Sequence, residues 1–389
     1  MKSHFPGNYS TTLALLAGVC CGAAVGVLWP DAALFVKPAG DIFLNLLFAL
    51  VAPMVFFSIS LAFLRLKARG RVGAILLRTL LSLAVIWLVC CSLSYVCTVL
   101  VNPLGDASAL AVPDAASTPD ASSSVPKFHL LPLIVLSALT GLGTAAAGSR
   151  GKAFAEFLES ADAVVMKTMD MLMKAAPVGL SCYFAPMVAS VGGVLIGGYL
   201  RVLVMYCILA AVLLFLVIPL SILLLRGRSG LKSFLSGILP PSLAALSTAS
   251  SSIAMPLNFD AARGMGIDAD VAQSVVPLAT NLLKAGSAAL DVMKIVFLMT
   301  LCGMDVAGAG NAFLIIGLAV LSALVSGAVT NGGVTGELLI CTMLGIDPAM
   351  AGMIMIIGTM ADIPATLVNS QSTVVAAVLA DSGNRRDES

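Results

Sequence analysis

Six long apolar stretches occupy the first 225 residues and limit what this chain can fold into. They cover residues 11–28, 42–64, 74–101, 130–147, 161–191 and 194–225. A helix needs about 20 apolar residues to cross the hydrocarbon core of a bilayer. Backbone polar groups in lipid must be satisfied within the segment, which a helix achieves. We therefore expect an all-α polytopic membrane protein, embedded in the lipid bilayer.

Composition excludes several functional classes. Charged residues make up 11% of the chain, against about 25% in a typical soluble domain. The net charge of +1 gives no attraction for nucleic acid, so we expect no such partner. The nine cysteines and two histidines show no zinc-site spacing, and we expect no metal site and no cofactor. We expect no enzyme, because no nucleophile–base pattern or phosphate loop is found.

The distribution of basic residues orients the chain. Arg65, Arg150 and Arg226 follow the second, fourth and sixth stretches, and an excess of basic residues marks the cytoplasmic side. The segment 102–126 carries three aspartates and no basic residue, which predicts an external loop. The first stretch has no clear cleavage site, so we expect a retained span. We expect a multi-pass protein of the plasma membrane, the inner membrane of a bacterium.

After Gly230 the apolar stretches become interrupted. A serine run lies in 235–256, polar and glycine residues break 271–301 and 313–344, and Asp362, Pro364 and Asn369 lie in 349–380. This order predicts a duplicated unit, a hairpin followed by a helix. Interrupted segments in corresponding places of two halves indicate the binding site of a transporter. The expected topology brings the two hairpins together tip to tip.

Two interpretations of the serine run, 247–256, stay open at this point. Serine and threonine compete for backbone hydrogen bonds and favour turns. Irregular backbone at membrane depth is tolerated only where protein buries it or a watery cavity adjoins it. The run is therefore either a re-entrant tip that touches a solute or a loop outside the membrane.

These residues resemble the glutamate/aspartate transporter family, the dicarboxylate/amino acid:cation symporters. Ser250–Ser252 followed by Pro256 is similar to the family's first hairpin tip, and Pro277-Leu278 followed by Gly286-Ser287 to its broken seventh helix. The resemblance covers nearly the whole chain. It implies eight transmembrane helices plus two re-entrant helical hairpins, inverted repeats, an elevator-type transporter and a homotrimer.

The resemblance also implies a division of the chain. Residues 1–127 would form scaffold helices 1–3 and the external loop, and residues 128–230 would form helices 4–6 of scaffold and core. Residues 231–389 would form the transport core, with hairpin 1, broken helix 7, hairpin 2 and helix 8.

The substrate site implied by the resemblance draws on both hairpin tips, the broken helix and the last helix. Its residues are Ser250, Ser251, Ser252, Ser287, Gly332, Gly333, Asp362, Thr366 and Asn369. In the family, the aspartate matched by Asp362 holds the substrate amino group and the asparagine matched by Asn369 holds the α-carboxylate. Asp362, Thr366 and Asn369 are spaced i, i+4, i+7 and share one helix face.

Departures from the family pattern shape the expected substrate. The arginine that pairs a side-chain carboxylate in acidic-substrate members is Ala365 here, and the acidic residue that supports it is Gly358. Without that cation nothing there clamps a second carboxylate. We therefore expect a small neutral amino acid, moved by alternating access. The alternative is a sodium- or proton-coupled symporter of dicarboxylates or acidic amino acids; a non-transporting receptor or a leak channel is the alternative of another class.

The sodium sites of the family look degenerate in this chain. The family's Asn-Met-Asp-Gly-Thr is replaced by Leu283-Lys284-Ala285-Gly286-Ser287, and a late carboxylate by Thr373. An ionisable group within a span costs about 2.5–3.5 kcal/mol on insertion scales, so Lys284 is a functional candidate. We hypothesise that its ammonium stands where a sodium ion would and offsets Asp362 or the substrate carboxylate. Coupling would then be by a proton through Lys284 or Asp362, or absent.

Structural roles for these charges compete with that hypothesis. Lys284 lies seven residues before Asp291, on the same helix face, and the two would form a simple ion pair. Asp291 and Lys294 are three residues apart, a spacing at which oppositely charged side chains meet on a helix.

Overall fold

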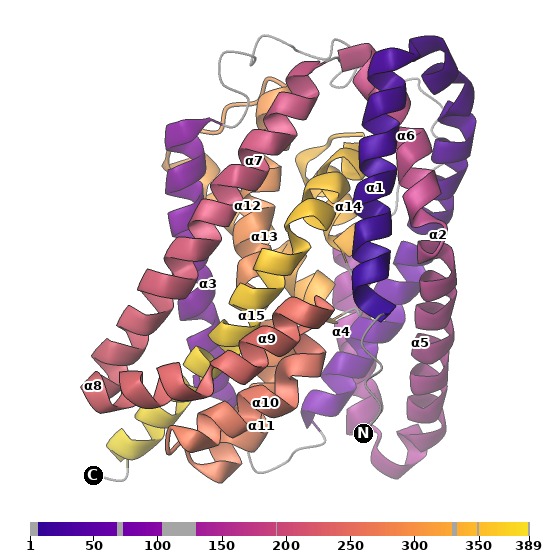
Figure 1. Cartoon of the computed structure of the whole chain (residues 1–389). Helices are drawn as coiled ribbons and strands as arrows, with labels where there is room; N and C mark the ends of the chain where they lie inside the picture. The colour runs from indigo at the N-terminus through magenta and orange to yellow at the C-terminus, as the bar shows by residue number, and fades with distance from the viewer. Residues whose placement is uncertain are drawn as a thin grey trace.

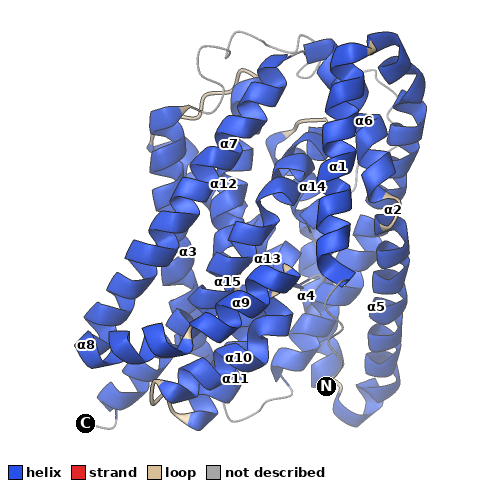
Figure 2. Cartoon of the chain, in the orientation of Figure 1, coloured by secondary structure: helices blue, strands red, loops and turns tan. Residues whose placement is uncertain are grey.

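The computed structural model describes residues 7–67, 73–102, 130–191, 193–328, 333–347 and 350–387. All regular secondary structure in this part of the chain is helical, and no strand occurs there (Figure 2). The all-α prediction is thereby confirmed. Gly332 and residues 103–126 of the expected external loop lie outside the described residues.

Eight helices cover the region of the six apolar stretches. They are α1 (Gly7–Leu28), α2 (Pro30–Lys67), α3 (Gly73–Val101), α4 (Leu130–Ala146), α5 (Lys152–Met173), α6 (Ala176–Val191), α7 (Gly193–Val212) and α8 (Ile218–Gly237). One π-helical turn, Leu213–Val217, joins α7 to α8. The chain bends within α8 at Gly227 (φ 67°), and Arg226 beside the bend pairs with Asp381 near the C-terminus.

Seven helices follow in the described residues, six of them of 20 residues or fewer and the last of 37. They are α9 (Leu239–Thr248), α10 (Ser251–Gly264), α11 (Ala269–Leu282), α12 (Ala285–Leu301), α13 (Ala309–Ala328), α14 (Gly333–Leu344) and α15 (Ala351–Asp387). In Figure 1, α9, α10 and α11 lie in the lower half of the molecule and α12 and α14 in the upper half, with α15 running past both groups.

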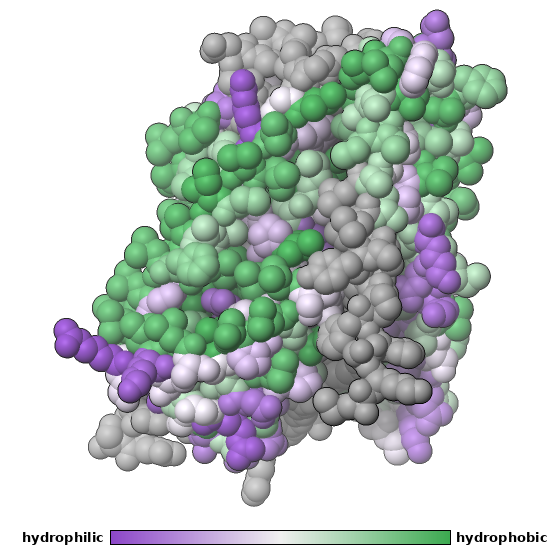
Figure 3. Space-filling model, in the orientation of Figure 1, coloured by the Kyte–Doolittle hydropathy of each residue, from purple (hydrophilic) through white to green (hydrophobic). Residues whose placement is uncertain are grey.

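Several of these helices suit a membrane. Within the described residues, five are long and apolar enough to cross one, or six if the pair α5–α6, bent by 59°, counts as one span. Apolar residues cover most of the surface over α7 and α8, and hydrophilic residues gather toward the lower edge of this face (Figure 3). These features indicate a polytopic membrane protein, and the number of eight crossings stays a prediction.

Packing divides the helices into two groups (Figure 1). Helices α1, α2, α4, α5 and α6 pack mainly against one another. Helix α3 packs against α12 and α15, and α7 packs mainly against α15. The expected segments 1–127, 128–230 and 231–389 follow chain order, whereas this packing does not, and the three-part division stays a prediction.

Three glycines spaced four residues apart bring α1 against α6. A Cβ atom added to Gly18, Gly22 or Gly26 would lie 2.2, 2.6 or 2.4 Å from a backbone oxygen of α6. Small residues at this spacing let two membrane helices approach closely, so that van der Waals contact replaces the hydrophobic effect as the driving force. These three glycines explain why one face of α1 packs closely against α6, although apolar residues lie on all sides of α1.

Replacing Gly22 with alanine tests this contact. We expect Gly22→Ala to lower stability by about 1–3 kcal/mol, because a methyl group forced against backbone has no rotamer in which to escape. The measurement is thermal unfolding of the purified protein in detergent.

Gly197→Ala on α7 is the matched control, since nothing lies within 4 Å of its added Cβ. Equal behaviour of the two variants would contradict the proposed close contact.

Candidate functional site

The span over 271–301 is broken at Lys284, as its polar residues predict. Helix α11 ends at Leu282, α12 begins at Ala285, and Lys284 between them has a left-handed backbone (φ 32°). This conformation costs a residue with a Cβ atom roughly 1–2 kcal/mol. The break exposes the last carbonyls of α11 and the first N–H groups of α12, which need partners at this depth.

The serine run forms the tip of a tight helical hairpin. Helix α9 ends at Thr248, the following Ala249 is left-handed (φ 48°), Ser250 is extended, and α10 begins at Ser251. Both arms pack against α15. Ser251 is buried, and its hydroxyl oxygen accepts a hydrogen bond from Lys284 Nζ at 2.9 Å. This geometry favours the hairpin-tip interpretation over the external loop.

Asn369 on α15 caps the first turn of α12. Its Oδ1 accepts hydrogen bonds from the backbone nitrogens of Gly286 (2.8 Å) and Ser287 (3.3 Å), and its Nδ2 donates to Ser287 Oγ (3.0 Å). Gly286 permits this approach, because a Cβ there would lie 2.4 Å from the carbonyl oxygen of Ala365. Asn369 thus satisfies two orphan N–H groups of α12, and its expected contact with a substrate carboxylate stays a prediction.

The remaining predicted residues surround this junction unevenly. Asp362, on the same helix as Asn369, is exposed and interacts electrostatically with Lys284, whereas Thr366 one turn later is buried. Ser252 is exposed, and Ser250 is half-buried at the hairpin tip. Of the second tip, Gly333 begins α14, and Gly332 lies outside the described residues. The structure therefore shows two direct contacts among the predicted residues, Lys284 with Ser251 and Asn369 with Ser287.

Side chains from α3 and α7 donate hydrogen bonds to carbonyl groups at the break and in the following turn, and the sequence reasoning missed them. The Trp87 indole N–H donates to the carbonyl oxygen of Leu283. Tyr206 donates from its hydroxyl to the carbonyl oxygen of Gly286 at 2.8 Å, and Ser94 to that of Ala289 at 2.6 Å. A buried tryptophan or tyrosine normally has a hydrogen-bond partner, and this was the available signal.

A second charged cluster lies further along α12. Lys294 Nζ is 3.0 Å from Asp291 Oδ1, as the i, i+3 spacing predicts, and 2.8 Å from Glu337 Oε1 on α14, which the sequence reasoning missed. The alternative pairing of Lys284 with Asp291 is wrong, because Lys284 bonds Ser251 and Asp291 bonds Lys294.

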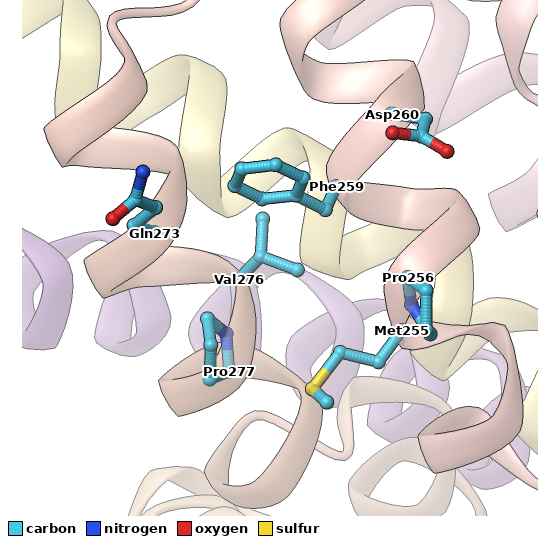
Figure 4. A pocket seen from close by; sticks show the side chains of 7 residues that line it. All are labelled: Met255, Pro256, Phe259, Asp260, Gln273, Val276 and Pro277. Atoms are coloured by element: carbon cyan, nitrogen blue, oxygen red, sulfur yellow. The ribbon is translucent and has the colours of Figure 1, made fainter.

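An open groove of about 310 Å³ runs between α10 and α11. In Figure 4 the Phe259 ring lies over Val276, and the Gln273 and Asp260 side chains lie on opposite sides of it. It is lined by Met255, Pro256, Phe259, Asp260, Gln273, Val276 and Pro277, and it contains none of the predicted binding residues.

The role of Asn369 as a cap leads to a stability prediction. We expect Asn369→Ala to lower stability by about 0.5–2 kcal/mol, as the loss of an N-cap does, because two N–H groups of α12 lose their acceptor. Thermal unfolding in detergent measures it.

The control is Asn281→Ala, since among the described residues the exposed Asn281 side chain bonds only a carbonyl of its own helix. A larger loss for Asn281→Ala than for Asn369→Ala would contradict the capping role.

Comparison with known proteins now places the chain. The family model described as the sodium:dicarboxylate symporter family matches residues 11–382. A C4-dicarboxylate transport protein of Bacillus subtilis (strain 168) is 24% identical over 344 residues, 83% of this chain and 81% of that protein. C4-dicarboxylate transport protein 3 of Bradyrhizobium diazoefficiens is 25% identical over 367 residues, 88% and 82% of the two chains. A proton/sodium-glutamate symport protein of Bacillus subtilis is 24% identical over 394 residues, 93% and 90% of the two chains. Together with the apolar helices, these matches mean that the chain is a multi-pass membrane protein and belongs to the sodium:dicarboxylate symporter family, a family of transporters, not enzymes.

Proposed function

We propose that this protein is a secondary transporter of a small acidic solute, a dicarboxylate or an acidic amino acid, coupled to sodium or protons. The names of the relatives support this alternative and do not support the neutral amino acid expected from Ala365. That expectation considered only α15 as the source of a cation. The helix break supplies one from another element.

The observation that carries the proposal is the position of the Lys284 ammonium at the first hairpin tip. An ammonium has three N–H donors, and Ser251 takes one at 2.9 Å. No other hydrogen-bond partner of Lys284 occurs among the described residues. The remaining donors are suited to a substrate carboxylate, which a charged donor binds more strongly than a neutral one.

Asp362 selects among acidic solutes. Its exposed carboxylate interacts electrostatically with Lys284 and would repel a second carboxylate placed beside it. A substrate amino group would be attracted instead. L-Aspartate and succinate carry the same two carboxylates and differ by that amino group, so we expect L-aspartate to bind more tightly.

The movement and assembly follow the family's pattern in this proposal. The order of α9–α10, α11–α12, α13–α14 and α15 supports a pair of hairpin-plus-helix units arranged as inverted repeats. The α1, α2, α4–α6 group would be the static scaffold of a homotrimer, and the rest the moving part of an elevator. The relatives are bacterial, which supports the inner membrane as the location.

The test is counterflow of labelled L-aspartate in proteoliposomes. We expect Lys284→Met to reduce uptake at low substrate concentration about 10–100-fold, since a hydrogen bond to a charged group contributes about 1.5–3 kcal/mol. Lys167→Met, at an exposed position on α5, is the control and should leave uptake unchanged.

Competition by unlabelled solutes decides the substrate class. Inhibition by L-aspartate and succinate, with L-alanine inactive, supports an acidic solute. Inhibition by L-alanine alone would contradict it and support a neutral amino acid as the substrate. Binding without counterflow would indicate a receptor, and ion current without saturable counterflow a channel.

A further inference from the structure

The cluster of Asp291, Lys294, Glu337 and Ser322 joins three helices in the interior. Asp291 and Lys294 lie on α12, Glu337 on α14 and Ser322 on α13. The three charged residues are 4%, 5% and 2% exposed. The cluster is separate from the Lys284–Ser251 contact, and the proposed function assigns it no role.

The charges of this cluster do not balance. Two carboxylates, Asp291 and Glu337, share the single ammonium of Lys294, at 3.0 and 2.8 Å. With all three groups ionised the cluster carries one net negative charge. A buried charge without compensation is costly, and proteins normally pair it or neutralise it.

The hydrogen bonds distinguish the two carboxylates. Asp291 has both oxygens occupied, Oδ1 by Lys294 and Oδ2 by the Ser322 hydroxyl at 2.7 Å. Glu337 bonds Lys294 through Oε1 only. Its Oε2 is buried and has no hydrogen-bond partner among the described residues. A proton on Glu337 Oε2 would neutralise the cluster without breaking a bond of Asp291.

The groups around Glu337 are few. Helix α12 presents Asp291 and Lys294, and Cys341 lies one turn further along α14. Helix α13 contributes the uncharged Ser322. Helix α2 also contacts α14, yet Glu337 has no electrostatic interaction with a described ionisable group of α2.

Helix α15 presents Gly358 to the cluster, and this glycine leaves the room that the Lys294–Glu337 pair occupies. A Cβ at position 358 would lie 3.0 Å from Lys294 Nζ and 3.1 Å from Glu337 Oε1. One turn later on α15, Asp362 interacts electrostatically with Lys294.

We propose that Glu337 is a proton-binding site that couples proton movement to transport. The inference rests on the proposed function and names its coupling group. The step is proton uptake from water by the Glu337 carboxylate, with no bond between heavy atoms formed or broken. Lys294 stays paired with Asp291.

Protonation changes how α14 is held. While Glu337 is ionised, its bond to Lys294 is an ion pair between α14 and α12. Protonation removes the Coulomb attraction between the two opposite charges and leaves a hydrogen bond from the Lys294 ammonium to a neutral acid, so a neutral Glu337 holds α14 more weakly. Glu337 lies in the second turn of α14, which begins directly after the expected second hairpin tip. The proton therefore acts on the arm that carries this tip.

The experiment compares exchange with gradient-driven uptake in proteoliposomes that contain a pH-sensitive dye. Counterflow of labelled L-aspartate at equal pH on both sides needs no net proton movement, whereas accumulation driven by an acidic exterior does. We expect Glu337→Gln to retain counterflow and to lose gradient-driven accumulation by about tenfold, within the usual range of coupling between sites.

Glu156→Gln is the matched control, because Glu156 is an exposed carboxylate on α5 paired with Lys152. It should behave as the unmodified protein in both assays. In vesicles with the unmodified protein, the dye should report proton entry during net uptake of L-aspartate.

Three outcomes decide the matter. Gradient-driven accumulation that survives in Glu337→Gln overturns the inference. Net uptake of L-aspartate by the unmodified protein into vesicles that contain no solute, without any proton entry, overturns it too, even if Glu337→Gln fails to fold. Absence of counterflow of both L-aspartate and succinate in the unmodified protein overturns the proposed function, and this inference with it.

Discussion

The interruption of the helix at Lys284 is the constraint on which the rest of the core depends. A left-handed residue at this depth leaves carbonyl and N–H groups without partners in their own helix, and water is scarce there. Two other elements supply them: Asn369 from α15 accepts from N–H groups of α12, and Trp87 from α3 donates to the carbonyl of Leu283. Tyr206 from α7 adds a hydrogen bond to the carbonyl of Gly286 in the first turn of α12. The packing of α3 and α7 against the C-terminal helices follows from this need.

Local sequence was informative where local chemistry decided the structure. Serine, glycine and lysine within apolar stretches predicted the break at Lys284, since they disfavour an uninterrupted membrane helix. For the serine run they left the hairpin tip at Ser250 as one of two interpretations. The i, i+3 spacing likewise predicted the pairing of Asp291 with Lys294.

Contacts between distant segments could not be predicted in this way. Glu337 lies 43 residues from Lys294, and Trp87 lies 196 residues from Leu283, so no helical spacing connects either pair. The glycines of α1 contact α6 at a separation of some 160 residues in sequence. From sequence alone, a glycine in an apolar helix is equally compatible with a position that faces lipid. The names of the relatives do not support the neutral substrate predicted from Ala365. Ala365 concerns a cation at one position of α15 and says nothing about Lys284, which lies between α11 and α12.

The amide oxygen of Asn369 accepts two hydrogen bonds at the N-terminal, positive end of α12. A solute that draws this amide away uncovers two backbone donors aimed at the same place. The N–H groups of Gly286 and Ser287, which Asn369 accepts from in the structure, would then be available to an anionic solute. Under the proposed transport function, occupancy of the site would be exchanged for order in that helix turn, and both donors stay paired while no solute is bound.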